Sequence, residues 1–286
     1  ALIFHAARSL GASPEQVSSW VLALGVGMGV TTIGLSIWQR APILITWSTP
    51  GAAVIASAAS GVSLGEATGA FLVCGVLMLL CGLTRWFERI MDRIPVALAS
   101  ALLAGILAKF ALMAFAGGST HPALVVTMLV TYLVGKRWWP RYAVLGVLII
   151  GTSLAASQGL LNTRELNLSW AEPVWVTPQW SWHAVIGMGL PLFIVTMASQ
   201  AVPGVSAIRV SGYAAPVSPL MSWSGVATLL LAPFGGYTFN LAAITAAIVL
   251  SPHAHSDKSK RYTAAVTAGL FYIAMGVLGG AVAGLL

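Results

Sequence analysis

The chain has 286 residues, of which 58% are hydrophobic and only 7% are charged, and its mean hydropathy is +0.90. Soluble domains carry about 25% charged residues, so this composition excludes a soluble globular enzyme and a soluble domain with a single membrane anchor. The net charge of +7 could suggest a polyanion-binding surface, but the basic residues follow the membrane topology, so no nucleic-acid partner is expected.

Apolar windows follow one another along the chain and predict an all-α polytopic membrane protein in a lipid bilayer. In chain order, the predicted spans are 1–10, 16–38, 42–59, 64–83, 95–116, 121–136, 141–158, 183–202, 216–232, 236–250 and 262–286. The first window starts, and the last one stops, within an apolar run. We therefore expect the chain to be a fragment of a longer protein that lacks the start of its first span.

Lysine and arginine residues are concentrated in alternate loops. Eleven of the fourteen fall on one side of the predicted membrane, namely Arg40, Arg85, Arg89, Arg93, Lys136, Arg137, Arg141, Arg209, Lys258, Lys260 and Arg261. Positively charged loops face the cytoplasm, so this side is predicted to be cytoplasmic and residues 159–182 to form an external loop. The tryptophans of that loop are typical of the membrane–water interface.

Two of the predicted spans are interrupted by helix-breaking and polar residues. The first interruption is 47–51, within span 42–59, and the second is 233–240, around the start of span 236–250. Non-helical backbone in a bilayer needs protein or a water-filled cavity to pair its N–H and C=O groups. A pair of such spans, one in each half of the chain, is the best sequence indicator of a transporter binding site.

The first interruption predicts a short extended segment, 46–50, followed by a half-helix. Thr49 or Ser48 is suited to the N-cap position and Pro50 to the first helical position. We expect this segment to approach the second extended segment near the membrane centre.

The second interruption predicts a similar arrangement. The extended segment should cover 234–239, where Gly235 permits a turn. Thr238 or Asn240 could then cap a half-helix that begins near Leu241.

The external loop separates seven predicted spans from four, and the interrupted span is the third in each group. Because seven is odd, a second copy of the same unit would cross the membrane in the opposite direction. We therefore expect inverted seven-span repeats, the second of which lacks its last three spans.

Four segments carry a resemblance to a known family: TWSTPGAA at 46–53, LPLFIVTMASQ at 190–200, GYAAPVSPL at 212–220 and AAITAAI at 242–248. In combination, over essentially the whole length, they resemble the benzoate/proton symporter family of bacterial inner-membrane proteins. This family is similar in fold to uracil, nucleobase and sulfate permeases.

The resemblance implies fourteen spans, in which the first four of each repeat form a core domain and the last three a gate domain. The expected domains are therefore 1–94 (core, first repeat), 95–158 (gate, first repeat), 159–182 (external loop) and 183–286 (core, second repeat). The gate domain could also support a homodimer, as in related permeases.

The resemblance also implies import of benzoate or a similar aromatic carboxylate with a proton, by alternating access, across the bacterial inner membrane. Two half-helix N-termini would offer N–H groups and partial positive charge to the carboxylate. The predicted substrate-binding residues are Ser48, Thr49, Gly51, Gln200, Thr238, Phe239 and Asn240.

Nucleobase permeases carry an acidic residue in the span that corresponds to 183–202, where this chain has Gln200. A neutral group there favours an anionic substrate, since a fixed carboxylate would repel it. Two other interpretations stay open: Gln200 could bond a neighbouring helix, and Ser48, Thr49 and Asn240 could act only as helix caps.

The candidates for proton coupling are His5, in the first predicted span, and Lys109, about two-thirds of the way across the fifth. Either could instead be structural, His5 as a packing residue and Lys109 by extending to the interface. The substrate itself could also carry the proton.

The alternatives are a nucleobase or inorganic-anion carrier of the same fold, a channel, and an intramembrane enzyme. No span contains an activated nucleophile motif or paired carboxylates, so we expect neither catalysis nor a cofactor. His253, His255 and Asp257 lie together in a cytoplasmic loop without a further ligand, so no metal site is expected.

Overall fold

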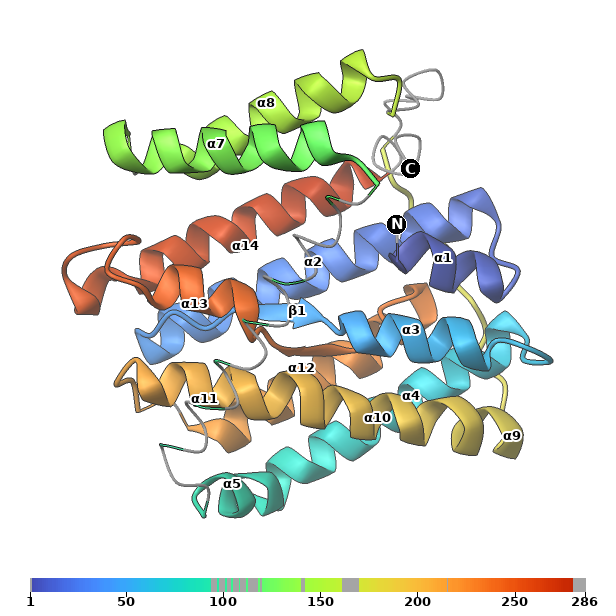
Figure 1. The fold of residues 1–286 in the computed structure, drawn as a ribbon. Coiled ribbons are helices and arrows are strands. Elements are labelled where there is room, and N and C mark those ends of the chain that lie inside the picture. The colour runs from blue at the N-terminus through green and yellow to red at the C-terminus, as the bar shows by residue number, and fades with distance from the viewer. Residues whose placement is uncertain are drawn as a thin grey trace. The chain divides into compact units, whose positions relative to one another are not determined.

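The computed structural model of the chain describes residues 2–93, 120–139, 142–160, 170–214 and 216–279, together with isolated positions between 97 and 118. The described part is mostly helical (Figure 1). It divides into two compact units, of which the first holds both ends of the described chain and the second holds its middle. Lys109 and most of the predicted span 95–116 lie outside the described residues.

The second unit is a helical hairpin. It consists of α7 (Pro122–Trp138) and α8 (Ala143–Ser157), which match the predicted spans 121–136 and 141–158 closely. Gly135 lets the two helices approach, because a Cβ atom at this position would lie 3.0 Å from the Cα atom of Ala143.

The first unit contains the remaining elements. Its first part comprises α1 (Leu2–Ser9), α2 (Pro14–Gln39), β1 (Ile45–Trp47), α3 (Thr49–Ala58), α4 (Leu64–Leu83) and α5 (Trp86–Met91). Its second part comprises α9 (Trp182–Ala184), α10 (Leu190–Thr196), α11 (Val202–Val210), α12 (Val217–Leu231), β2 (Phe239–Leu241), α13 (Ile244–Leu250) and α14 (Tyr262–Val277). Among the described residues, four helices are long and apolar enough to cross a membrane: Pro14–Gln39, Leu64–Leu83, Trp182–Val210 and Val217–Phe234. This confirms the prediction of a helical membrane protein.

The helix from Trp182 to Val210 is longer than the predicted span 183–202, which was wrongly ended before Pro203. Proline lacks an N–H and its ring collides with the carbonyl four residues earlier in a regular helix. Here the π-helical turn Met197–Ala201 lies directly before Pro203, and the turn Val185–Gly189 lies before Pro191. Each turn changes the local hydrogen-bond spacing, so the helix continues through both prolines.

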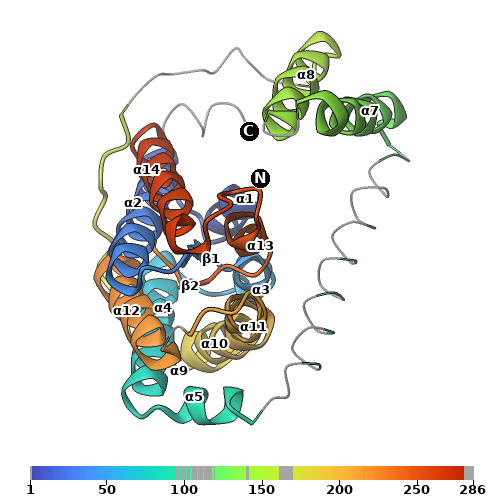
Figure 2. The ribbon, with the colours of Figure 1, turned by 90° about the vertical axis from the view of Figure 1, so that its left-hand side faces the viewer.

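Two helix pairs, α2 with α14 and α4 with α12, form one side of the first unit (Figure 2). Both pairs depend on glycine. A Cβ atom on Gly25 of α2 would lie 2.4 Å from the Cα atom of Gly276, and one on Gly225 of α12 would lie 2.6 Å from the backbone nitrogen of Leu79. Small residues at such contacts allow the close backbone packing by which membrane helices associate.

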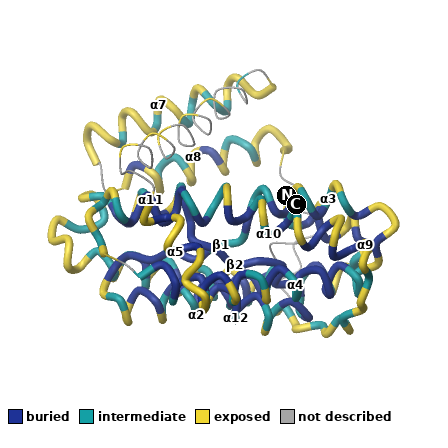
Figure 3. Tube along the Cα trace, turned by 90° about the horizontal axis from the view of Figure 1, so that it is seen from below, coloured by how far each residue is buried: buried dark blue, intermediate teal, exposed yellow. Residues whose placement is uncertain are grey.

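The two strands pair in the middle of this unit, between the helix pairs and α1, α3, α10, α11 and α13 (Figure 2). The pairing is antiparallel, with Ile45 opposite Leu241, Thr46 opposite Asn240 and Trp47 opposite Phe239. The prediction that the two interrupted segments are extended and meet is therefore confirmed for these residues. β2 is buried along its length, whereas in β1 only Ile45 is fully buried and Thr46 and Trp47 are half-buried (Figure 3).

The bounds of the second extended segment differ from the prediction of 234–239. Residues Ala232–Phe234 continue α12 as a 3₁₀ turn, and Gly235 then reverses the chain with φ +97°, close against Trp20. The strand is shifted accordingly to Phe239–Leu241. As a result α13 begins at Ile244 after Ala243, so neither Thr238 nor Asn240 caps it. In the first segment, Thr49 and Pro50 are already helical.

The outer edges of the strand pair are closed by hydroxyl groups from the neighbouring helices. Thr32 of α2 accepts a hydrogen bond from the Ile45 N–H at 2.9 Å, and Thr228 of α12 accepts one from the Phe239 N–H at 3.1 Å. Just before the first strand, the Ser36 hydroxyl accepts a hydrogen bond from the Ile43 N–H at 3.2 Å. These bonds supply partners that neither water nor a third strand provides in a bilayer.

Replacing Thr32 with valine should therefore destabilise the fold by about 1–3 kcal/mol, because the buried Ile45 N–H loses its side-chain partner while the shape is kept. Thermal unfolding of the purified protein measures the effect. Thr31→Val is the matched control, since the Thr31 hydroxyl only bonds carbonyls of its own helix. Equal unfolding temperatures for the two variants would contradict this role of Thr32.

Candidate functional site

The two faces of the strand pair differ in polarity. Trp47 and Phe239 lie on one face, and Phe239 is directed toward α2, where its ring would collide with a Cβ atom on Gly27 at 2.3 Å. Successive side chains of a strand alternate between faces. Thr46 and Asn240, which are opposite each other, therefore lie on the other face. The helix from Trp182 to Val210, which comprises α9, α10 and α11 and is called α9–α11 below, contacts β2 through its turn Met197–Ala201.

Ser48 connects the first strand to this helix. It is the N-cap of α3, and its Oγ accepts a hydrogen bond from the Gly51 N–H at 3.0 Å. The same Oγ accepts one from the Thr196 hydroxyl of α10 at 2.9 Å. The Ser48 carbonyl accepts a third bond, at 3.2 Å, from the hydroxyl of Tyr237. Ser48 thus joins three separate segments at the start of α3.

Gly51 allows α3 to lie directly against α10. A Cβ atom there would lie 2.7 Å from Cδ1 of Leu192 and 2.9 Å from Cβ of Ser48. The N-terminal end of α3 carries the partial positive charge of the helix dipole. Thr49 and Pro50, in its first turn, are half-buried.

Asn240 has an unsatisfied hydrogen-bonding group in the interior. It is 1% exposed, and its Oδ1 accepts a hydrogen bond from the Leu241 N–H at 2.8 Å. Its Nδ2 has no partner among the described residues. A buried amide without an acceptor costs about 1–3 kcal/mol, and such groups mark a position that a ligand or ion can use.

Gln200 lies in the π-helical turn Met197–Ala201, which packs against β2. Its side chain is half-buried and makes no hydrogen bond to any residue that the structure describes. The interpretation in which Gln200 bonds a neighbouring helix therefore has no counterpart in this part of the chain. Single π-helical turns are frequent at functional sites.

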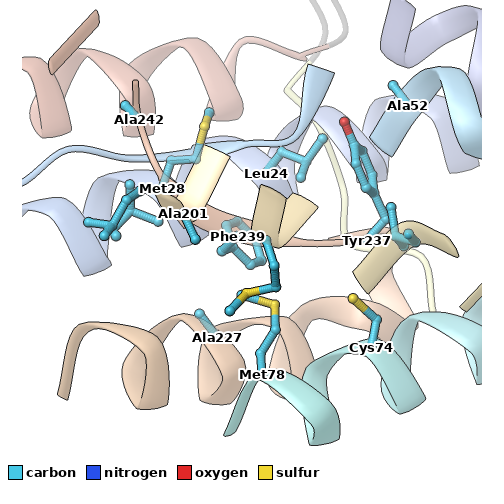
Figure 4. Close-up of a cluster of buried hydrophobic side chains, with 14 of the residues drawn as sticks. Leu24, Met28, Ala52, Cys74, Met78, Ala201, Ala227, Tyr237, Phe239 and Ala242 are labelled. Atoms are coloured by element: carbon cyan, nitrogen blue, oxygen red, sulfur yellow. The ribbon is translucent and has the colours of Figure 1, made fainter. Parts of the chain in front are cut away.

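Two of the predicted substrate-binding residues lie on the core side of the strand pair. Phe239 is fully buried, and Figure 4 shows it in the cluster with Leu24, Met28 and Met78. Thr238 donates a hydrogen bond to the sulfur of Met78 at 3.6 Å. The structure therefore places Ser48, Thr49 and Gly51 at the start of α3, Asn240 on β2, and Gln200 in the turn that packs against β2. Thr238 and Phe239 instead contact core residues.

Tyr237 holds Ser48 from within a cluster of aromatic side chains. It is fully buried, and its ring centroid lies 5.8 Å from that of Trp20, 6.1 Å from that of Phe71 and 6.4 Å from that of Trp47. Figure 4 shows its hydroxyl directed toward the first turn of α3, where Ala52 lies. The aromatic cluster thereby fixes the hydroxyl that bonds Ser48.

Thr196 is the residue of this site that the sequence did not single out. Its signal was a hydroxyl within the apolar run LPLFIVTMA, where a polar side chain needs a partner. That partner, Ser48, is 148 residues away in the chain, so no local pattern identifies it.

His5 lies apart from these groups. It is exposed on α1, whose buried residues Phe4, Ala6 and Ala7 occupy the opposite side of the helix. All the polar groups gathered around the strand pair are uncharged. Hydroxyl, amide and backbone N–H donors of this kind suit an anion, which they can bind without a basic side chain.

Comparisons with known proteins show which family the sequence matches. The sequence matches the family described as benzoate membrane transport protein over residues 1–286. It is 45% identical over 286 residues to the inner membrane protein YdcO of Escherichia coli (strain K12), covering 100% of this chain and 73% of that protein. It is 36% identical over 284 residues to the benzoate membrane transport protein of Acinetobacter baylyi (strain ATCC 33305 / BD413 / ADP1), covering 99% of this chain and 72% of that protein.

The close contact at Gly51 predicts that Gly51→Ala destabilises the protein by about 1–3 kcal/mol, because a methyl group would force α3 away from Leu192. Gly34→Ala is the matched control. Gly34 lies in α2 with nothing within 4 Å of an added Cβ atom, so alanine should stabilise by about 0.5–1 kcal/mol. Thermal unfolding of both variants measures the two signs, and a stabilised Gly51→Ala protein would contradict the packing at this site.

Proposed function

The chain belongs to the benzoate membrane transport protein family, and we propose that it imports benzoate or a similar aromatic carboxylate together with a proton across the bacterial inner membrane. As a member of this family it is a membrane transporter and not an enzyme. The observation that carries the substrate proposal is the buried Nδ2 of Asn240, which has no partner among the described residues and lies near polar groups that are uncharged in the same part of the chain.

In this proposal the carboxylate lies between the start of α3 and β2, within reach of Thr49, Gly51, Gln200 and Asn240. The N-terminal end of α3 stabilises the negative charge, and Asn240 and Gln200 donate hydrogen bonds to it. Ser48 positions the first turn of α3 through its bonds to Gly51 and Thr196. Binding would supply the acceptor that the Asn240 amide lacks.

The uncharged lining favours an aromatic carboxylate over the substrates of related carriers. A nucleobase presents N–H donors, which a fixed carboxylate side chain can accept, whereas an anionic substrate would be repelled by such a group. In this chain the residues proposed to face the substrate, Gln200 and Asn240, are neutral donors, and Gln200 stands in the span where nucleobase permeases carry an acidic residue. A nucleobase or inorganic-anion carrier of the same fold is the second candidate.

The arrangement of the first unit supports an inverted repeat. If α2 corresponds to α12 and α4 to α14, each of the two glycine-dependent helix pairs joins one repeat to the other. The strands, which follow α2 and α12, then pair antiparallel, as related segments of opposite orientation would. In this proposal residues 1–94 and 183–286 form the core domain, 95–158 belong to the gate domain, and alternating access moves one against the other.

For the proton, we favour His5. Benzoate is an anion at neutral pH, so its uptake against an inside-negative potential needs a compensating cation. Histidine is the side chain that changes charge between pH 5 and 8. His5 is exposed and apart from the strand pair, so its charge would act on the anion at a distance, from the helix α1 that packs against α3. Protonation would strengthen the attraction for the anion, and loss of the proton would help release. Lys109 and the substrate itself are the other candidates for carrying the proton.

Asn240→Ala and Gln200→Ala should each weaken benzoate binding by about 1–3 kcal/mol, since each removes a buried hydrogen bond to the carboxylate. Uptake of labelled benzoate by purified protein in liposomes, with an imposed pH gradient, measures this. Gln39→Ala, at the cytoplasmic end of α2, is the matched control and should leave uptake unchanged. Unchanged affinity in both site variants would remove these residues from the site, and inhibition by uracil or sulfate rather than by unlabelled benzoate would favour the second candidate.

His5→Gln should keep benzoate binding but abolish accumulation driven by the pH gradient, because glutamine cannot carry the proton. The same liposome assay, compared with a binding measurement on the purified variant, separates the two effects. His183→Gln, at the start of the helix α9–α11, changes the same residue type at the far end of a span and should remain coupled. Gradient-driven accumulation by His5→Gln would assign His5 a packing role only.

A further inference from the structure

An apolar groove lies on the surface of the first unit, away from the strand pair. It is formed by one stretch of α2 and by α12, which lie side by side (Figure 2). Its volume is about 350 Å³, and it is lined by Val30, Thr31, Gly34, Leu35, Trp38 and Trp223. The only hydroxyl in the lining, that of Thr31, is bonded to its own helix. Apart from the indole N–H groups of Trp38 and Trp223, the lining of the groove is therefore apolar.

The length of the groove along α2 is close to the thickness of the hydrocarbon layer in one leaflet of a bilayer. Val30 and Trp38 are eight residues apart on α2, which corresponds to about 12 Å at 1.5 Å per residue. One leaflet contributes about 15 Å of the roughly 30 Å hydrocarbon layer. Leu35 is 4% exposed and forms the floor, whereas Trp38 and Trp223 are 59% and 51% exposed and form the walls near one end.

A positively charged residue, Arg40, follows the last lining residue of α2 in the chain, although it is not itself part of the lining. Arg40 follows Trp38 by two residues, at the end of α2 that the charge pattern places on the cytoplasmic side. Its side chain is exposed and makes no hydrogen bond or ion pair with any residue that the structure describes. Tryptophan and arginine at this level are typical of the contact between a protein and lipid headgroups.

We propose that this groove is a binding site for one acyl chain of an anionic phospholipid of the cytoplasmic leaflet, with the phosphate group of the lipid at Arg40. The acyl chain covers the apolar lining over the depth of one leaflet, and Arg40 supplies the complementary charge. This inference is independent of the proposed substrate and of its site.

Gly34 gives a direct way to test the groove. Nothing lies within 4 Å of a Cβ atom added at Gly34, so a larger side chain can enter the groove without disturbing the fold. Gly34→Leu should therefore fill the space that the acyl chain occupies. Gly187→Leu is the matched control, because Gly187 is also exposed and has nothing within 4 Å, on the separate helix α9–α11.

The full chain is reconstituted in vesicles that contain trace phosphatidylglycerol with a diazirine on one acyl chain, or the equivalent phosphatidylcholine. After illumination, labelling of residues 30–38 is measured relative to labelling of the exposed residues of α8. We expect the phosphatidylglycerol probe to label 30–38 about five-fold more than the phosphatidylcholine probe, the effect of one arginine near an anionic lipid. Gly34→Leu should reduce labelling to the level of α8, and Gly187→Leu should not.

Arg40→Gln should keep labelling of the groove but make the two probes equal. The proposal is overturned if residues 30–38 are labelled no more than α8, or if Gly34→Leu leaves labelling unchanged. Equal labelling by both probes in the unaltered chain would exclude an anionic headgroup at Arg40. Cross-linking of residues 30–38 to a second copy of the chain, in place of lipid, would show that protein covers the groove and would also overturn it.

Discussion

The fold depends on pairing every backbone N–H and C=O group of two non-helical segments inside a membrane. The segments achieve this partly through each other, in the antiparallel pair of β1 with β2, and partly through hydroxyl groups on the helices beside them. Thr32 and Thr228 close the two edges, so the strand pair needs no third strand. The glycine contacts pack α2 against α14 and α12 against α4, so the two helices that carry Thr32 and Thr228 are each held by a close helix pair.

Against this background, the one buried amide without an acceptor among the described residues stands out. The same segment that has its backbone satisfied by Thr228 leaves Nδ2 of Asn240 unpaired, at 1% exposure. Retaining such a group is costly unless something binds it. The site that we propose combines this amide with Gln200 and the start of α3, and among the described residues these groups are donors without a fixed charge. Such a site would bind a carboxylate without an arginine or a lysine.

The sequence predicted where several helices begin and end, but it did not predict which distant residues they contact. Hydropathy located α4 at 64–83, and the order Ser48, Thr49, Pro50 predicted the start of α3, because these features are local. The start of α13 was misplaced, since it depends on Gly235 turning against Trp20, 215 residues earlier in the chain. Thr196 was missed for a similar reason: its bond to Ser48 joins different spans. The π-helical turn that accommodates Pro203 has no sequence pattern of its own.

The most direct test of the central claim is a distance between the substrate and Asn240. Solid-state NMR of the protein in lipid, with benzoate labelled at the carboxyl carbon and asparagine labelled at the side-chain nitrogen, measures it. The account predicts a coupling that corresponds to a hydrogen bond, with nitrogen and oxygen about 3 Å apart, and its loss in Asn240→Asp. Bound benzoate without any coupling to the Asn240 amide would contradict the account.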